Sequence, residues 1–451
     1  MDDNAQQSTI AIPWRNRWSQ LIIGMVCMAL VANLQYAWTL FVAPMHARHQ
    51  WSLASIQLAF SIFILTETWL VPFEGWLVDR FGPRPVVAAG AVCAGLSWVL
   101  NSYATTLGML YVSAVIGGIG AGCVYGTCVG NALKWFPDRR GLAAGLTAAG
   151  FGAGAALTVI PIANMITSHG YESAFLFFGI VQGVSILVLA MLLTRPNLRQ
   201  KGIRKSRFVV SKADFTARQM LKTPIFWVMY VSFVAVAAGG LMATAQLGPI
   251  AKDWGIARIP MPFLGMTLPL LTVTLSIDNV FNGLTRPLCG FISDRIGREN
   301  TMFLIFIGEG LALLGMMQFG SNPFAFMFYA ALIFLFWGEI FSIFPAICAD
   351  TFGSKYAAAN AGTLYTAKGT ASLLVPVASL LSATGGWNLV FIVAAVITIA
   401  AGVSAKFILA PMRARWIESH GQPQGEPDGA LAMAGHGSAS RSSRWPEHSG
   451  E

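Results

Sequence analysis

The chain has 451 residues, of which 55% are hydrophobic and 11% are charged, and its mean hydropathy is +0.62. A soluble globular domain carries about 25% charged residues, so this composition excludes an ordinary water-soluble protein and predicts an integral membrane protein. The formal net charge of +9 fits a signal for membrane topology better than nucleic-acid binding.

Apolar stretches of about 20 residues, the length needed to cross a bilayer as a helix, occur twelve times. The predicted spans are 18–44, 53–78, 85–103, 108–133, 141–168, 172–194, 224–250, 267–293, 300–319, 324–350, 357–384 and 386–411. The sequence therefore predicts an all-α membrane protein with twelve transmembrane helices.

Lys and Arg residues concentrate on one side of this topology. Of the 29, 24 fall in the two tails or in the loops that follow even-numbered spans, whereas only Arg48, Lys252 and Arg258 fall on the other side. Because positive loops stay in the cytoplasm, we expect both termini to be cytoplasmic in a multi-pass protein of the plasma (cytoplasmic, or cell inner) membrane. Residues 1–10 are acidic and polar, so no cleavable signal peptide is predicted.

A polar segment divides the chain into two halves. Residues 195–223 contain nine Lys and Arg and are predicted to form a cytoplasmic linker between one six-helix bundle, 18–194, and another, 224–411. Residues 1–17 form a cytoplasmic tail. Residues 412–451, rich in Gly, Ser, Pro and His, are expected to be a disordered cytoplasmic tail.

The six cysteines lie within spans or at their ends, without a CxxC pair or a His at ligand spacing. They are predicted to pack as small apolar residues. We therefore expect neither a disulfide framework nor a metal site, and no cofactor.

One motif follows span two and is repeated 215 residues later, after span eight. The first copy contains Gly75, Asp79, Arg80, Gly82 and Arg84, and the second contains Gly290, Asp294, Arg295, Gly297 and Arg298. The glycines permit a tight turn, and the Asp can accept hydrogen bonds at a helix N-terminus or pair with an Arg. A single copy would indicate only a turn between helices, whereas two copies at equivalent places indicate a duplicated six-span unit.

This motif resembles the loop motif of the major facilitator superfamily, and the resemblance covers about residues 18–411. It implies a fold of two pseudo-symmetric six-helix bundles in which the motif residues gate the cytoplasmic side. The second copy has Glu299 where the family commonly has a basic residue, so its charge network is expected to be weaker than that of the first.

Spans four and five are rich in glycine, which lets helices pack closely. Packing alone is the simpler explanation. Gly141, Gly150 and Gly154 also match the start of a span-five motif seen in antiporters of the superfamily, although Ala155 departs from its Gly-Pro. The resemblance therefore favours exchange slightly.

Arg286 and Lys368 are lone cations deep in spans eight and eleven. With a rise of about 1.5 Å per residue, they are expected roughly 10 Å and 16 Å from the cytoplasmic ends of their helices. A charge at that depth costs about 2.5 to 3.5 kcal/mol and is retained mainly for a pathway or a partner. The pair predicts an anion site, unless a buried acid such as Asp278 or Glu339 neutralises each cation.

Other polar and aromatic residues are expected at similar depth. Three short sequence segments resemble the oxalate/formate antiporter family of the superfamily. They are Leu-Gln-Tyr-Ala-Trp-Thr, Asn-Gly-Leu-Thr-Arg-Pro and Tyr-Thr-Ala-Lys-Gly. That resemblance implies an anion-binding pair, Arg286 and Lys368, with a pocket wall of Gln35, Tyr36, Tyr125, Trp337, Phe341 and Tyr365. The family would have Tyr and Trp at the last two positions, so oxalate itself is in doubt.

The sequence thus favours a carrier that exchanges small carboxylate anions across the lipid bilayer by alternating access, and that acts as a monomer without nucleic acid. The alternative within transport is a proton-coupled monocarboxylate symporter in which Asp278, Glu309 or Glu339 takes the proton. Resemblance to carriers of the monocarboxylate type would favour a lysine in span one, and this chain has none there. A membrane sensor is a third reading. No nucleophile, base and orienting acid occur at recognisable spacing, so an enzyme is not expected.

Overall fold

The computed structural model describes residues 16–136, 140–195, 214–353 and 356–420, and these residues are helical apart from connecting turns and one short hairpin. The helices of the first half are α1 (Arg17–Val31), α2 (Asn33–Tyr36), α3 (Trp38–His49), α4 (Leu53–Trp69), α5 (Val71–Phe81), α6 (Pro83–Ser102), α7 (Leu107–Trp135), α8 (Arg140–Ala153), α9 (Ala155–His169) and α10 (Tyr171–Leu192). The second half contains α11 (Ala217–Met220), α12 (Pro224–Asp253), β1 (Pro260–Phe263), β2 (Met266–Pro269), α13 (Leu270–Ile296), α14 (Arg298–Phe319), α15 (Pro323–Trp337), α16 (Ile340–Phe352), α17 (Ala357–Ser372), α18 (Leu374–Ser404), the π-helical turn η2 (Ala405–Leu409) and α19 (Ala410–His420).

Each of the twelve predicted spans coincides with a helix or a broken helix. Nine helical stretches among the described residues are long and apolar enough to cross a membrane. The other spans are the broken pair α4 and α5, the polar helix α13, and the second crossing inside 359–420, where Gly386 has non-helical angles (φ 70°, ψ 177°) and separates two helices. The predicted all-α fold of twelve transmembrane helices is therefore confirmed.

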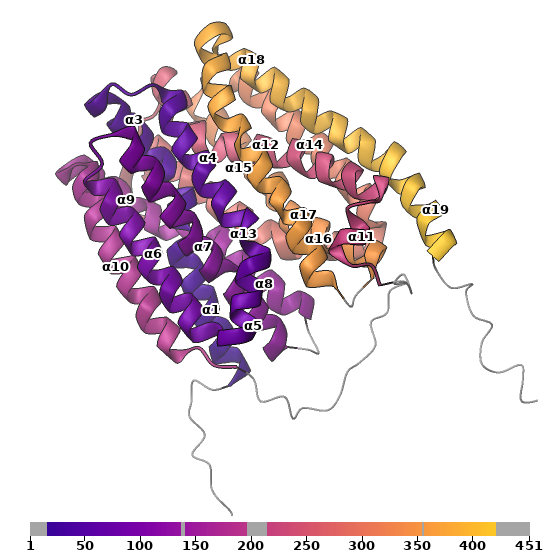
Figure 1. Ribbon diagram of the computed structural model, residues 1–451. Helices are drawn as coiled ribbons and strands as arrows, with labels where there is room; N and C mark the ends of the chain where they lie inside the picture. The colour runs from indigo at the N-terminus through magenta and orange to yellow at the C-terminus, as the bar shows by residue number, and fades with distance from the viewer. Residues whose placement is uncertain (1–15, 137–139, 196–213, 354–355, 421–451) are drawn as a thin grey trace, which may run out of the picture.

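The helices form two bundles that lie side by side (Figure 1). In the first, α6 packs between α7 and α10, and in the second, α14 packs between α15 and α18. The bundles meet where α4 contacts α17 and α18, and where α13 contacts α8 and α9. In Figure 1 the start of α1 lies at the bottom of the view, and α19 ends at the right, at the lower end of the long helix that follows α18.

Several spans are interrupted near their middle. The first divides at Ala32 and Ala37 into α1, α2 and α3, and the tenth divides at Gly338 and Glu339 between α15 and α16. Discontinuous helices present side chains and backbone groups toward the interior of a transporter. The sequence patterns predicted these spans but not their breaks.

Glycines in span five pack against α1. A methyl group at Gly150 would lie 2.9 Å from the Met25 carbonyl oxygen, and one at Gly154 would collide with Ala29. These contacts support the packing explanation for the glycines. Gly141 lies in α8, but its surroundings are outside the described part.

The two copies of the repeated motif form equivalent turns. Gly82 joins α5 to α6 with φ 93° and ψ 172°, and Gly297 joins α13 to α14 with φ 90° and ψ 152°. Only glycine adopts this region readily. Gly75, Asp79 and Asp294 also lie in helices, but their side chains or surroundings are outside the described part.

The basic residues of the motif make different contacts in the two copies. Arg84 donates through Nε to the Leu193 carbonyl oxygen at 3.2 Å, which ties α6 to the end of α10. Arg80 and Arg295 each lie over a phenylalanine of their own helix. Gly290 has open space at the position of an added methyl group, among the residues described.

The second copy carries an ion-pair network that the sequence did not predict. Arg298 Nε lies 3.3 Å from Asp350 Oδ2, Arg413 Nη2 lies 3.9 Å from the same oxygen, and Arg413 also binds Glu299. Glu299 thus takes part in this network through Arg413 on α19. That the network is weaker than the one of the first copy stays a prediction, because the Asp79 side chain is outside the described part.

Two segments differ from the sequence predictions. The chain remains helical to His420, where Trp416 Nε1 donates to the Thr351 carbonyl oxygen, so residues 412–420 are not disordered. Within the predicted linker, residues 214–223 include α11 and are ordered against α16. Residues 1–15, 196–213 and 421–451 of the predicted tails and linker are outside the described part.

The hairpin of β1 and β2, with Pro260 paired to Pro269, was not predicted.

The positive φ angle at Gly297 predicts that the second copy of the motif requires glycine at this turn. We expect Gly297→Ala to destabilise the protein by about 1 to 3 kcal/mol, because alanine is strained at this φ although a methyl group would meet only Asn300, at 3.8 Å. Thermal unfolding of the purified protein in detergent measures the effect. Gly290→Ala, which introduces the same methyl group into open helical space, should leave the melting temperature unchanged or raise it. Equal losses in the two variants would contradict the proposed strain.

Candidate functional site

The two predicted cations border the same aromatic side chain in the second bundle. Arg286 is on α13 and Lys368 is on α17, and their exposed fractions are 2% and 0%. The Arg286 guanidinium carbon lies 4.5 Å from the centre of the Phe341 ring, and Lys368 Nζ lies 5.6 Å from it. The fold thus brings the two residues of the predicted anion-binding pair to one place.

Lys368 has an acidic partner from the other bundle. Its Nζ lies 2.9 Å from Glu67 Oε2 and 3.0 Å from Gln35 Oε1, and 3.4 Å from the Tyr365 hydroxyl. Glu67 is on α4 and is 1% exposed. Asp278 and Glu339 were the partners expected from the sequence, and Glu67 was missed, although an acid inside a span is as informative as an arginine inside one.

Arg286 has no such partner. None of its three guanidinium nitrogens makes a hydrogen bond of normal geometry with the residues that the structure describes, although the Tyr125 hydroxyl lies close to it. A buried guanidinium without an acceptor is costly. A planar carboxylate is the acceptor whose shape matches it, through two parallel hydrogen bonds.

Six aromatic side chains form a closed ring of contacts between the bundles, which we call the aromatic collar. Taken in order around the collar, they are Tyr36, Phe151, Tyr125, Tyr365, Phe341 and Trp337, and neighbouring ring centres are 5.2 to 6.4 Å apart. The first three belong to the first bundle and the last three to the second. Lys368 Nζ lies within 5.7 Å of three collar rings. Phe151 was not predicted, because nothing in an apolar span distinguishes it.

Unpaired donors gather around this collar. Besides Arg286, Gln35 Nε2 and Trp337 Nε1 are buried without a hydrogen-bond partner in the described part of the chain. Buried polar groups are normally satisfied, so a cluster of unsatisfied donors beside a cation favours an anionic ligand. Asn282 Nδ2 donates to the Tyr36 hydroxyl at 2.8 Å and fixes that ring across the bundle interface.

Two glycines make room for the site. A methyl group at Gly152 would lie 3.1 Å from Arg286 Nε, and one at Gly240 would collide with the Trp337 indole. The absence of a side chain at these positions therefore lets α8 and α12 approach the guanidinium and the indole closely.

Three buried acids of the second bundle stay separate from the cations. Asp278, Glu309 and Glu339 are each fully buried, and neither carboxylate oxygen of any of them has a hydrogen-bond partner among the residues described. Asp278 and Glu339 therefore do not neutralise Arg286 and Lys368 in this structure.

Hydrogen bonds join the two bundles on the side away from the start of α1 and the end of α19. Gln57 Nε2 donates to the Ala245 carbonyl oxygen at 2.7 Å, and the Gly248 amide donates to Thr39 Oγ1 at 2.7 Å. These hydrogen bonds hold the two bundles together on that side of the collar.

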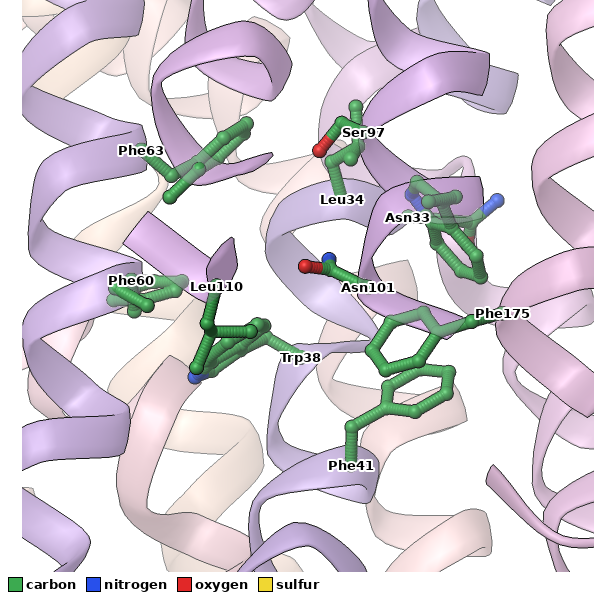
Figure 2. Close-up of a pocket in the computed structure, with 13 residues that line it drawn as sticks. Asn33, Leu34, Trp38, Phe41, Phe60, Phe63, Ser97, Asn101, Leu110 and Phe175 are labelled. Carbon is green, nitrogen blue, oxygen red and sulfur yellow. The ribbon is translucent and has the colours of Figure 1, made fainter. Parts of the chain in front are cut away.

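A separate small cavity lies within the first bundle (Figure 2). Its lining includes Asn33, Trp38, Phe41, Asn101 and Phe175, and its volume is about 20 Å³. That is room for about one water molecule, and the lining contains neither buried cation. This cavity is therefore not the anion site.

Comparison with known proteins gives an independent result. The model of the Major Facilitator Superfamily matches residues 21–274 and 237–435. The chain is 35% identical over 402 residues to the oxalate:formate antiporter of Oxalobacter formigenes, covering 88% of this chain and 92% of that protein. It is 27% identical to the uncharacterized MFS-type transporter YhjX of Escherichia coli (strain K12), covering 80% and 86%. It is 24% identical to the probable sulfoacetate transporter SauU of Cupriavidus necator, covering 87% and 94%.

The ion pair between the bundles yields a prediction about stability. Lys368→Met leaves the Glu67 carboxylate buried without its cation, and breaking a buried pair in this way costs about 3 to 5 kcal/mol. We expect a large fall in melting temperature in detergent. The double variant Lys368→Met with Glu67→Leu, which removes both charges, should recover most of it. If the double variant is as unstable as the single one, the cost comes from lost packing instead of an unpaired charge.

Proposed function

Because this chain belongs to the major facilitator superfamily, we propose that it is a secondary active transporter that exchanges small carboxylate anions across the membrane by alternating access. The observation that carries the proposal is the buried Arg286 guanidinium. It makes no hydrogen bond of normal geometry with the described residues and lies beside Lys368 at an aromatic collar between the bundles. Such a site needs a small anion to complete it.

Each predicted site residue has a role in this proposal. Arg286 holds a carboxylate through two parallel hydrogen bonds, and Lys368 supplies a second positive charge nearby. Gln35 Nε2 and Trp337 Nε1 offer further donors. The collar excludes water and limits the size of the ligand, which strengthens the electrostatic attraction in the interior.

The relative from Oxalobacter supports the carboxylate class, because its printed name is an oxalate:formate antiporter and it matches 88% of this chain. The exchange mode rests on a physical argument. Without an anion, Arg286 is an uncompensated buried charge, which raises the barrier for the empty carrier to change conformation. A bound carboxylate lowers that barrier, so transport in one direction requires a carboxylate for the return.

The conformation fits one state of an alternating-access cycle. Hydrogen bonds at Gln57 and Thr39 join the bundles on the side away from the ends of the chain. We propose that both termini face the cytoplasm at the plasma membrane, as the distribution of Lys and Arg predicts. The described state then has its extracellular side closed. We propose that the carrier acts as a monomer and that the turn motif takes part in gating.

A proton-coupled monocarboxylate symporter is the second candidate, and the buried acids favour it. Asp278, Glu309 and Glu339 have unpaired carboxylate oxygens in the described part, and a buried acid without a partner tends to hold a proton. Their separation from both cations argues for exchange as the first choice, because no described contact links them to the anion site.

The central role of Arg286 can be tested directly. We expect Arg286→Lys to reduce carboxylate affinity more than tenfold, because an ammonium cannot make the two parallel hydrogen bonds of a guanidinium. Binding of radiolabelled formate and oxalate to purified protein measures this loss. Arg258→Lys, a conservative change at an exposed position, serves as the control and should bind as the wild type does. Near-normal affinity in Arg286→Lys would exclude this site.

Proteoliposomes distinguish exchange from proton symport. We expect uptake of labelled carboxylate only when unlabelled carboxylate is present inside, and little uptake from a pH gradient alone. Glu339→Gln and Asp278→Asn should leave counterflow intact. Strong accumulation in vesicles without internal anion, driven by an acidic exterior and lost in either variant, would instead establish proton symport.

A further inference from the structure

Lys368, one of the two cations of the proposed site, is already paired with the carboxylate of Glu67. Glu67 Oε2 lies 2.9 Å from Lys368 Nζ, and the two side chains are 1% and 0% exposed. The other carboxylate oxygen, Oε1, has no hydrogen-bond partner within the described residues. Glu67 thus stands where one carboxylate group of a substrate would bind Lys368.

The position of Glu67 is fixed by close packing on both sides. Against α7, a methyl group at Gly122 would lie 2.9 Å from the Glu67 carbonyl oxygen. Against α17, a methyl group at Gly369, next to Lys368, would collide with Thr68. Trp69 Nε1 also donates to the Thr366 carbonyl oxygen at 3.2 Å. Helices in such contact hold the acid and the lysine together at the bundle interface.

The charges of the site therefore sum to one positive charge. Arg286 and Lys368 contribute two, Glu67 removes one, and the other buried acids form no ion pair with either cation in the described part: Asp278, Glu309, Glu339 and Glu74. We propose that Glu67 is a specificity residue that restricts transport to carboxylates with a single negative charge. This inference rests on the proposed function and specifies its substrate class.

Electrostatics gives the reason. A monocarboxylate bound to Arg286 brings the buried site to neutrality. A dicarboxylate either leaves it with a net negative charge or displaces Glu67 from Lys368, and both outcomes place an uncompensated carboxylate in a low-dielectric interior. A dianion would also have to fit inside the aromatic collar, where Phe341 and Tyr365 lie against Lys368.

The test compares two anions that differ in charge. Purified protein in proteoliposomes is loaded with formate, and competition by external formate and oxalate is measured during counterflow. We expect the wild type to prefer formate to oxalate by at least tenfold in affinity. Glu67→Gln, which raises the site to two positive charges, should shift the ratio of oxalate to formate affinity upward by at least tenfold.

Glu74→Gln is the matched control. Glu74 is another buried acid of the same span, 2% exposed, and its carboxylate oxygens have no hydrogen-bond partner among the residues described. Its removal should leave the oxalate-to-formate ratio unchanged. A charge-restoring variant, Glu67→Gln with Lys368→Gln, returns the site to one positive charge and should return the ratio toward that of the wild type.

Each outcome decides between the two claims. An unchanged ratio in folded Glu67→Gln, or a wild type that binds oxalate as tightly as formate, overturns the role of Glu67 and leaves carboxylate exchange intact. If Glu67→Gln does not fold, the wild-type preference decides alone. Absence of counterflow with every monocarboxylate and dicarboxylate tested would overturn the proposed function itself.

Discussion

The structure depends on how charge is balanced between two apolar bundles. Lys368 and Glu67 come from opposite bundles and form a fully buried ion pair, whereas Arg286 lies beside them without an acidic partner in the described part. Because an unpaired ion in a low-dielectric interior costs several kcal/mol, the arrangement is stable only if something compensates Arg286. The aromatic collar offsets part of this cost through the Phe341 ring, 4.5 Å from the guanidinium carbon.

Hydropathy predicted the positions of the spans but not which of their residues face the other bundle. The twelve spans and the depth of Arg286 and Lys368 could be predicted, because depth in a membrane follows from position along a helix. Five of the six collar residues were expected in a pocket wall only through the resemblance to the oxalate/formate antiporter family. Glu67 and Phe151 could not be placed at the site, because hydropathy gives no information on which face of a helix meets the other bundle. The pair Glu67 and Lys368 is separated by 301 residues, and only packing brings them together.

The duplicated motif shows where sequence symmetry stops. Gly82 and Gly297 adopt nearly the same positive φ angles, so the turn itself is preserved in both halves. The surrounding contacts differ, since Arg84 binds the end of α10 while Arg298 joins Asp350 and Arg413 in a network that reaches α19. The helix beyond residue 411 exists because its Arg413 and Trp416 find partners on α14 and α16, which composition alone did not reveal.

The ion pair between Lys368 and Glu67 also affects how the proposed exchange would be enforced. Two free cations would make the empty carrier very costly to occlude, but Glu67 keeps Lys368 compensated after a substrate leaves. The barrier to an empty return then depends on Arg286 alone. The collar contacts that join Tyr36 to Trp337 and Tyr125 to Tyr365 cross between the bundles, so both bundles contribute to the surroundings of the two cations. In the proposed cycle, the Arg286 guanidinium responds to whether an anion is bound, and Glu67 limits the charge that this anion carries.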